Sequence, residues 1–376
     1  MTRLKLKSTV GQKNGPLSPC CPASKQDLPA WVYGAVTTPA GPVLKVSTGL
    51  TGKDYWEHFK CRTTSFRNNY TVNPGLYAVG DPDKNSDVLV SSNYKYSFDI
   101  LRRELNGLNV WVLVLDTKGI NVWCAAGKGT FGTNELIGRI ARVRLKEIVD
   151  HRRLIVPQLG APGVSAYKVK QAAGFHVLFG PVLAKDLPAY IAAGHKATES
   201  MRKIGFSILD RLVLTPLELS PVMKKFILFT IFVFAVFGLT PSGIIFRDAI
   251  SGGLPFVLLG FVSVIAGALL TPLLLPVIPF RSFAIKGWLV GLLSVYVSMK
   301  LFPMLDQQNI LLIIIVYLFF PLVSSYLALL FTGSTTFTGM TGVKKELGIS
   351  VPLYLGGTAI SLIILVIYKL GEWRII

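Results

Sequence analysis

The sequence predicts an α/β domain followed by an all-α transmembrane domain of five helices. Strand-like and helix-like segments alternate between residues 70 and 193, and five long apolar segments follow residue 222. Such alternation is typical of a mainly parallel sheet covered by helices, and segments of about 20 apolar residues are long enough to cross a bilayer. The composition agrees, because 51% of the 376 residues are hydrophobic and only 16% are charged.

Four segments are expected along the chain. Residues 1–70, rich in Gly, Pro, Ser, Thr and Lys, are expected to form a loosely structured extension, and residues 71–200 the α/β domain. Residues 201–222 are expected to be a linker and residues 223–376 the transmembrane domain. The first residues are basic but no apolar core follows them, so we expect no signal peptide.

Apolar runs and their spacing predict the elements of the α/β domain. The helix at 134–150 has the clearest pattern, because Ile140 and Ile148 fall on one face while Arg139 and Arg142 fall on the other. The expected strands lie at 76–79, 88–91, 110–115, 154–156 and 176–179, and the other expected helices lie at 98–105 and 165–173.

Four loops follow these strands, at residues 92–94, 116–119, 160–163 and 180–182. Ligands of open α/β sheets bind beyond the carboxyl ends of the strands, so these loops are expected to form one rim. Gly and Pro also mark turns in any α/β fold, and about half of these loops are expected to serve only as turns.

The apolar segments indicate a membrane anchor rather than a transport path. Lys286 and Lys300 lie near segment ends, where long side chains reach the membrane surface, and no acidic residue lies in mid-segment. The second segment contains three prolines and is expected to kink or end early. The more basic loops are expected in the cytoplasm together with the α/β domain, which puts the carboxyl terminus outside. The segments lie near residues 225–246, 254–279, 283–303, 310–332 and 351–370.

The formal charge of +19 and the four cysteines limit the function classes. Lys and Arg accumulate on the cytoplasmic side of membrane proteins, and no nucleic-acid motif accompanies the charge, so no nucleic acid is expected as a partner. Cys20, Cys21, Cys61 and Cys124 show no CxxC or zinc-finger spacing, which suits free thiols in a reducing cytosol. The adjacent Cys20 and Cys21 are either an exposed pair or soft-metal ligands.

Residues 121–133, with the sequence NVWCAAGKGTFGT, hold the most unusual chemistry. A polarizable cysteine among small residues and glycines lets a flat, wide group approach the backbone. Three other interpretations stay open: a small buried cysteine, a Cys–His hydrolase, and a dinucleotide loop on the GxGxxG pattern. The dinucleotide loop is disfavoured because the preceding strand ends near Leu115, and a GxxxxGK[ST] phosphate loop is excluded because Val122 occupies its first glycine position.

The run NVWCAAGKG at 121–129 resembles the signature of the mercury-methylating corrinoid membrane proteins, the HgcA family. The resemblance extends through NPGLYAVG at 73–80, NYK at 93–95 and QLGAPG at 158–163. An apolar carboxyl-terminal part of the expected kind follows. The resemblance covers nearly the whole chain, and the amino-terminal segment carries it least.

This resemblance implies a Rossmann-like domain that binds a cobalamin-type corrinoid, with Cys124 as the catalytic residue and the lower axial ligand of cobalt. In the family this cysteine lies on a short cap helix over the corrinoid, and the cofactor's own base is displaced. Asn121 is expected to hydrogen-bond the sulfur or hold the turn, and Lys128 to pair with the corrinoid or with solvent. The residues expected to bind the cofactor are Asn121, Val122, Trp123, Cys124, Ala125, Ala126, Gly127, Lys128, Gly129, Thr130, Asn93, Gly160, Ala161, Pro162, Gly163, Gly180 and Pro181.

The resemblance also implies a reaction and its partners. Cobalt(I) accepts a methyl group from a folate-linked donor, and methylcob(III)alamin passes it to inorganic Hg(II), which makes methylmercury. A low-potential ferredoxin-like protein with 4Fe–4S clusters restores cobalt(I), since four cysteines at these spacings cannot hold a cluster in this chain. The chain would thus be a multi-pass methyltransferase of the cytoplasmic (inner) membrane, in contact with lipid. The alternatives are a corrinoid methyl carrier with a non-mercury acceptor and a membrane transporter with a nucleotide-binding domain.

Overall fold

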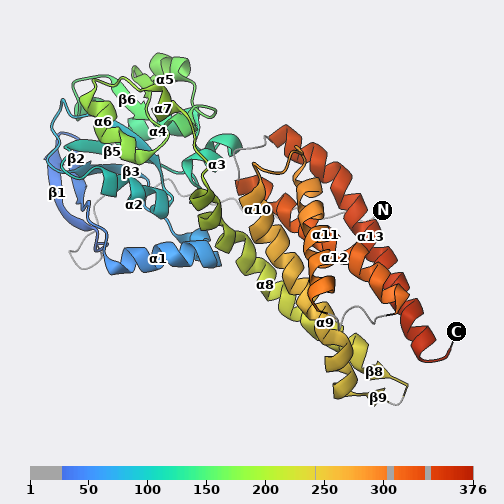
Figure 1. Ribbon diagram of the computed structural model, residues 1–376. Coiled ribbons are helices and arrows are strands. Elements are labelled where there is room, and N and C mark those ends of the chain that lie inside the picture. The colour runs from blue at the N-terminus through green and yellow to red at the C-terminus, as the bar shows by residue number, and fades with distance from the viewer. Residues whose placement is uncertain (1–27, 242, 303–308, 335–339, 376) are drawn as a thin grey trace, which may run out of the picture. The chain divides into compact units, whose positions relative to one another are not determined.

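The structure, a computed structural model, describes residues 28–241, 243–302, 309–334 and 340–375. The chain divides into two compact units, Met1–Tyr55 with Asn68–Arg202 and Trp56–Arg67 with Lys203–Ile376. Figure 1 shows the sheet of the first unit and the long helices of the second. Cys20 and Cys21 lie outside the described residues, so their role stays a prediction.

A seven-stranded sheet forms the first unit, in the order β1–β2–β3–β5–β4–β6–β7. The consecutive strands β5, β4, β6 and β7 are parallel, whereas β3 runs antiparallel to β5 and β1 antiparallel to β2. Only residues 80–87 connect β3 to β4, too few for the crossover that parallel strands require. The sheet is therefore mixed, and the expected parallel arrangement holds for the four strands from β5 to β7. The strands are β1 (Val32–Thr38), β2 (Gly41–Val46), β3 (Gly75–Val79), β4 (Val88–Ser92), β5 (Val110–Leu115), β6 (Arg153–Val156) and β7 (His176–Phe179).

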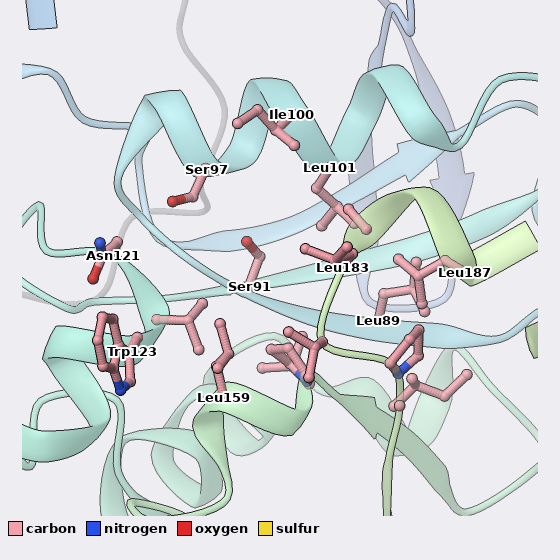
Figure 2. Close-up of a pocket in the computed structure, with 18 residues that line it drawn as sticks. Leu89, Ser91, Ser97, Ile100, Leu101, Asn121, Trp123, Leu159, Leu183 and Leu187 are labelled. Atoms are coloured by element: carbon pink, nitrogen blue, oxygen red, sulfur yellow. The ribbon is translucent and has the colours of Figure 1, made fainter. Parts of the chain in front are cut away.

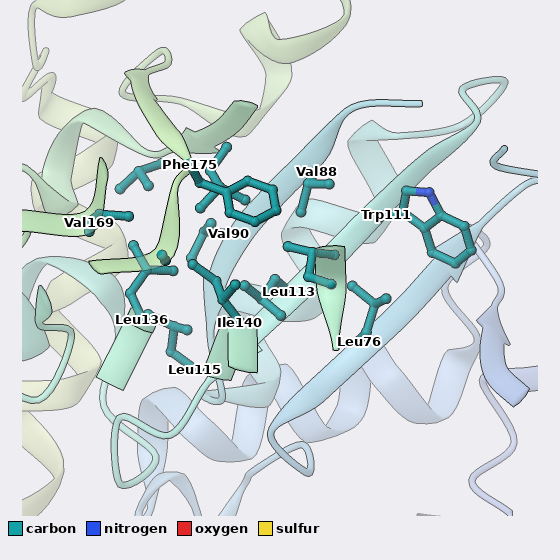
Figure 3. Packing of buried hydrophobic residues seen from close by; sticks show 14 of the residues in the cluster. Leu76, Val88, Val90, Trp111, Leu113, Leu115, Leu136, Ile140, Val169 and Phe175 are labelled. Carbon is teal, nitrogen blue, oxygen red and sulfur yellow. The ribbon is translucent and has the colours of Figure 1, made fainter. Parts of the chain in front are cut away.

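Helices cover both faces of the sheet. On one face, strand side chains such as Leu113 pack against α4 (Thr133–Arg142) and α5 (Ala166–Ala173), as Figure 3 shows. On the other face, strand side chains pack against α2 (Lys95–Glu104) and α6 (Leu187–Ala192). Successive side chains of a strand point to opposite faces, so the continuous apolar run of β5 supplies both cores.

The helix expected at 134–150 is shorter than predicted. It ends at Arg142, and Arg144 takes a left-handed conformation with a φ of 52°. A non-glycine residue in that region interrupts a helix. The tight turn that follows brings Leu145 and Ile148 into the core. The apolar period therefore predicts which side chains are buried but not the break between them.

Residues 28–69 contain regular elements, although a loosely structured extension is expected there. β1 and β2 form a hairpin, and α1 (Gly52–Thr63) follows it. Trp31 fixes this segment, because its ring centroid lies 5.8 Å from that of Tyr77 and 5.4 Å from that of Phe98. Strand preference depends on such tertiary packing more than on local composition, so the local sequence does not reveal the hairpin.

Four charged side chains are buried together where this segment meets α2. Lys95 Nζ lies 2.6 Å from Asp99 Oδ1 and 3.4 Å from Asp54 Oδ1, and Arg102 Nη2 lies 3.2 Å from Asp54 Oδ2. Burial alone would raise the pKa of Asp54, but hydrogen bonds from Thr51 and the charges of Lys95 and Arg102 outweigh it and hold the pKa at about 2. Each carboxylate here is needed to balance a buried cation.

Asp54→Asn is expected to destabilise the sheet unit by about 3 kcal/mol, because Lys95 and Arg102 would keep buried charges with one carboxylate fewer. The folded pKa of Asp54 lies below its ordinary value, so its contribution is complete above about pH 4 and is lost as the pH falls toward 2. Denaturant unfolding of the full chain in detergent, followed by circular dichroism, measures both effects. Asp81→Asn is the control, because Asp81 pairs with Lys45 at the surface. Equal losses in the two variants would contradict the prediction.

Five helices in the described part of the second unit are long and apolar enough to cross a membrane, as the sequence predicts. The first begins inside the expected linker 201–222, because Ser207 and Asp210 form a capping box. The second contains a π-helical turn followed by Pro272, in agreement with the interruption expected from its prolines. The helices are Ile208–Gly238 (α8), Phe246–Leu274 (α9 to α10), Phe283–Leu301 (α11), Ile310–Gly333 (α12 and one further turn) and Thr341–Glu372 (within α13).

Lys286 does not extend to solvent, as a lysine that reaches the membrane surface would. It is only 7% exposed, and its Nζ donates to the carbonyl oxygen of Leu275. Arg211 likewise donates to the carbonyl oxygens of Pro272 and Leu273. The last carbonyls of a helix lack partners within it, so the two cations satisfy the end of the second apolar helix.

Candidate functional site

The loops that follow β4, β5, β6 and β7 lie at one edge of the sheet, because these strands are parallel neighbours. Hydrogen bonds join the loops in pairs. Asn93 in the first loop accepts from the backbone of Thr117 and Gly119 in the second. Between the segments that follow β6 and β7, Gln158 N donates to Pro181 O at 3.5 Å. The four loops thus form the rim that the sequence predicts.

Asn93 is buried, and its side-chain oxygen forms hydrogen bonds with the neighbouring loop of the rim. Its Oδ1 accepts from Thr117 N at 3.0 Å, from Thr117 Oγ1 at 2.8 Å and from Gly119 N at 2.9 Å. This oxygen therefore holds the loop after β5 in place. In that loop, burial raises the pKa of Asp116, but hydrogen bonds from Lys118 and its charge outweigh burial and leave the pKa below its usual value. Asp116 is therefore ionised at neutral pH and pairs with Lys118 at 2.7 Å.

Cys124 lies on the first turn of α3 (Val122–Lys128), a short helix after the β5 loop. Asn121 caps this helix, since its Oδ1 accepts from Cys124 N at 2.9 Å. Asn121 is expected either to hydrogen-bond the sulfur or to hold the turn, and this contact corresponds to the second role. Gly129 ends the helix with a φ of 80°, which favours glycine. Cys124 is partly exposed, which the buried-cysteine interpretation does not predict.

Asn121→Ala is expected to loosen the turn that carries Cys124, because the amide of Cys124 loses its acceptor. Loss of a helix cap costs about 1 kcal/mol, so amide hydrogen exchange at Cys124 should become about fivefold faster. Mass spectrometry of the exchanged full chain measures this rate. Asn121→Asp keeps an acceptor at the same position and should exchange like the wild type. Equal exchange in Asn121→Ala and the wild type would show that the cap does not hold the turn.

Two glycines allow α3 to pack closely against the rim. A Cβ at Gly163 would lie 2.1 Å from Phe131 O and 3.1 Å from Ala126 Cα, and a Cβ at Gly160 would lie 2.5 Å from the Phe131 ring. Real Cβ atoms do not come so close to other heavy atoms, so larger residues are excluded unless the backbone moves. Around Gly127, by contrast, nothing lies within 4 Å of an added Cβ.

A cavity of about 310 Å³ lies beside the amino end of α3. Figure 2 shows Trp123 and Leu159 at one side of this cavity and Leu183 and Leu187 at the other. Its walls come from the carboxyl ends of β4 and β6, from α2, from α3 and from the loop after β7, and they are mainly aliphatic. A mostly apolar cavity with few polar groups is typical of a small-molecule site. The polar side chains among the lining residues belong to Ser91, Ser97 and Asn121.

The structure brings only some of the expected site residues to this cavity. Asn121, Val122, Trp123, Gly180 and Pro181 line it. The remaining residues of α3 divide by exposure, with Ala125 and Ala126 buried and Cys124, Gly127, Lys128, Gly129 and Thr130 partly or fully exposed. Residues 160–163 form the turn beneath α3, in which Gly160 is buried and Ala161, Pro162 and Gly163 are at least partly exposed.

One wall of the cavity, formed by α2 and by residues after β7, is not indicated by the sequence. Ser97, Ile100 and Leu101 come from α2, and Leu183 and Leu187 from residues after β7. Apolar side chains at helical spacing indicate a core face equally well, so the pattern carries no signal of a cavity. Ser91, a polar residue in the apolar strand β4, is a local hint of the cavity but not of this wall.

Two alternative interpretations of the Cys124 stretch lose support from this geometry. Gly127 lies inside α3 and Gly129 at its end, so the GxGxxG pattern does not form a turn between strand and helix. His151 and His195 bind residues just before β4, at the amino end of the strand and away from the rim. They are therefore poor partners for Cys124 in a hydrolase. Across the described residues, no group of three or more His, Cys, Asp or Glu side chains could hold a metal ion.

Known proteins resemble the segment that carries this site. The family described as CO dehydrogenase/acetyl-CoA synthase delta subunit matches residues 58–190. Acetyl-CoA decarbonylase/synthase complex subunit gamma of Methanopyrus kandleri is 31% identical over 134 residues, which are 35% of this chain and 29% of that protein. The subunit of the same name from Archaeoglobus fulgidus is 31% identical over 121 residues, which are 32% of this chain and 25% of that protein.

The corrinoid/iron–sulfur protein large subunit of Moorella thermoacetica is 26% identical over 179 residues, which are 42% of this chain and 40% of that protein. The chain thus spans less than half the length of each of these relatives. Together these matches support a corrinoid protein family, a broader assignment than the mercury-methylating family of the sequence resemblance. The family match ends at residue 190, before the first long apolar helix begins at Ile208.

Proposed function

We propose that this protein is a membrane-bound, corrinoid-dependent methyltransferase that passes a methyl group to inorganic Hg(II), with Cys124 as the lower axial ligand of cobalt. The observation that carries the proposal is the partly exposed Cys124, held by Asn121 at the rim beside an apolar cavity. A relative named corrinoid/iron–sulfur protein supports the choice of cofactor. The long chemical resemblance of residues 121–129 to the mercury-methylating family supports the choice of acceptor.

The residues around Cys124 fit a large, flat and mostly apolar group. Gly127 and Gly129 have nothing within 4 Å of an added Cβ, so a ring can approach the backbone there. Trp123 is 36% exposed and offers a flat apolar surface beside the cysteine. The cavity of about 310 Å³ would take a part of the cofactor outside the ring, such as the displaced base, with Ser91 and Ser97 as hydrogen-bonding groups.

When bound, a cobalt corrinoid supplies a methyl group that can be transferred to an electrophile. The sulfur of Cys124 is a soft donor that would bind cobalt, and a thiolate in that position would favour release of the methyl group with its electron pair, which Hg(II) needs. Asn121 keeps this residue on the first turn of α3 through the cap. Ala125 and Ala126, both buried, hold the helix against the rim and so limit movement of the sulfur.

The proposed reaction requires an electron donor and a methyl donor as partners of this chain. Cys20, Cys21, Cys61 and Cys124 are its only cysteines, and one of them is assigned to cobalt, so no four-cysteine cluster fits in the chain. A ferredoxin-like protein with 4Fe–4S clusters is therefore proposed as the low-potential electron donor. A folate-linked donor is proposed as the source of the methyl group.

The five apolar helices are consistent with a multi-pass membrane protein. We assign it to the cytoplasmic membrane, with the α/β unit in the cytoplasm and the carboxyl terminus outside. Lys224 with Lys225 and Lys344 with Lys345 support this orientation, because doubly basic segments next to membrane helices favour the cytoplasmic side.

A corrinoid methyl carrier with another acceptor is the second candidate, because the matched relatives are named as subunits of acetyl-CoA decarbonylase/synthase complexes. Single-turnover transfer separates the two candidates. The full chain in detergent is loaded with methylcobalamin and mixed with Hg(II), and methylmercury is measured against loss of bound methyl. The proposal predicts equal amounts of both. A chain that binds cobalt and keeps its methyl group after Hg(II) is added would favour the carrier. A chain that binds no cobalt would contradict both candidates.

A further inference from the structure

Helix α1 carries a cluster of exposed aromatic side chains. Tyr55, Trp56 and Phe59 are 56%, 59% and 54% exposed, respectively. Phe59 lies one helical turn after both Tyr55 and Trp56, so the three side chains fall within about 100° of the helix circumference. The rings of Trp56 and Phe59 stack on each other, with centroids 5.4 Å apart and planes 17° apart, so these two rings form one apolar unit. Removing large aromatic rings from water is favourable, and an exposed group of such rings is typical of a surface that contacts a membrane or another molecule.

Basic side chains border this aromatic face. At about 100° per residue, Lys53 and Lys60 flank it on one side and Arg62 on the other. The opposite side of the helix is buried, as Asp54 and Cys61 are 6% and 2% exposed. A helix with one buried side, one aromatic side and cations at the borders between them has the pattern of a helix that lies in a membrane surface.

The end of α1 is bound to the first apolar helix of the same unit. The hydroxyl of Ser220 on α8 donates a hydrogen bond to the carbonyl oxygen of Thr63, the last residue of α1. Ser220 precedes Lys224 and Lys225 by about one helical turn, and the apolar run of α8 follows these lysines up to Gly238. Lysines at the start of an apolar run mark the level of the lipid headgroups. The bound end of α1 is therefore at that level.

We propose that α1 lies in the membrane surface, with Tyr55, Trp56 and Phe59 at the boundary of headgroups and acyl chains. Lys53, Lys60 and Arg62 then contact anionic phospholipid headgroups. Tyr and Trp are enriched at this depth, because one part of each ring is apolar and the other is polar, and the cations match the negative charge of the lipid. The amino-terminal segment thereby gains a membrane contact of its own, in addition to the five apolar helices. This inference requires the membrane but neither the corrinoid nor mercury.

The test is quenching of tryptophan fluorescence by brominated lipid in the full chain. Wild type and Trp56→Phe are reconstituted into vesicles of phosphatidylcholine and phosphatidylglycerol, with and without bromine on acyl carbons near the headgroup. The difference between the two proteins is the emission of Trp56 alone. We expect this emission to be blue-shifted and strongly quenched by the brominated lipid. Emission from Trp56 that is red-shifted and unquenched would assign the face to water or to a protein partner and would overturn the proposal.

Two further variants test whether the quenching is specific to α1 and whether it depends on the basic side chains. Tyr167→Trp places a tryptophan at a position that is 74% exposed on α5, and the added emission should stay unquenched. Replacing Lys53, Lys60 and Arg62 together by Gln should lower the quenching of Trp56 in vesicles with phosphatidylglycerol and bring it to the value in pure phosphatidylcholine. Circular dichroism verifies that each variant is folded. Quenching in the triple variant that equals the wild-type value in both kinds of vesicle would refute the contact with anionic headgroups.

Discussion

Replacing Cys124 with alanine is expected to abolish methyl transfer to Hg(II) while the fold stays intact. Cys124 is partly exposed, and alanine is a strong helix former, so α3 should keep its cap and its packing. Loss of the ligand itself should exceed the roughly 10–100-fold cost of removing a group that only orients a ligand. Methylmercury formed in a single turnover by the full chain with methylcobalamin measures the effect.

Cys61→Ala is the matched control for that variant. It removes another cysteine side chain, on α1 and outside the candidate site, and should lose some stability but keep the transfer rate. A Cys124→Ala protein that transfers methyl groups at the wild-type rate would remove Cys124 from the proposed reaction. Loss of activity in both variants would point to a general requirement for thiols instead of a ligand at position 124.

Gly163→Ala should cause the largest loss of structure at the site. The new methyl group would lie 2.1 Å from Phe131 O and 3.1 Å from Ala126 Cα, both of which are backbone atoms. A backbone atom cannot avoid the clash by a change of rotamer, as a side chain can. The segment of α3 must therefore move away from the rim, at a cost of about 3 kcal/mol. Limited proteolysis near α3 should become faster, and cobalamin binding should be lost with it.

Gly127→Ala separates packing from contact with the cofactor. Nothing lies within 4 Å of the added methyl group, and alanine is the better helix former, so the apoprotein should be as stable as the wild type or slightly more stable. If a corrinoid ring approaches the backbone there, cobalamin affinity should fall by about tenfold, which corresponds to about 1.4 kcal/mol. Unchanged affinity would place the ring elsewhere, and equal proteolysis of Gly163→Ala and the wild type would contradict the packing account.

Sequence periodicity predicts most of the α/β unit correctly. The five expected strands and the helices at 98–105 and 165–173 correspond to β3 to β7, α2 and α5 with small shifts at their ends. Long apolar runs likewise predict the five helices of the described residues that are long and apolar enough to cross a membrane, because a crossing needs about 20 apolar residues. The rim also follows, because loops after parallel neighbouring strands meet at one edge.

Contacts between distant parts of the chain account for what the sequence does not reveal. The hairpin of β1 and β2 depends on Trp31 reaching Tyr77 and Phe98, and the burial of Asp54 depends on Lys95 and Arg102. Neither has a local pattern. The wall of the cavity from α2 is equally invisible, because its side chains have the spacing of a core face.

The partners of buried polar groups are also not visible in the sequence. Lys286 looks like a residue that reaches the membrane surface, but the carbonyl of Leu275 provides a partner that its sequence position does not show. Asn93 looks like a residue that faces a ligand, but three donors from the next loop occupy its oxygen. In both cases the position along an element is predictable, and the partner is not.

The ultraviolet–visible spectrum of the full chain with bound cobalamin tests whether the sulfur of Cys124 binds cobalt. Wild type and Cys124→Ala are compared at equal cobalt content, so a difference in affinity does not enter. We predict a charge-transfer signature of sulfur on cobalt in the wild type, and its absence in Cys124→Ala. Identical spectra in the two proteins would mean that the sulfur is not on the metal, and would contradict the role assigned to Cys124.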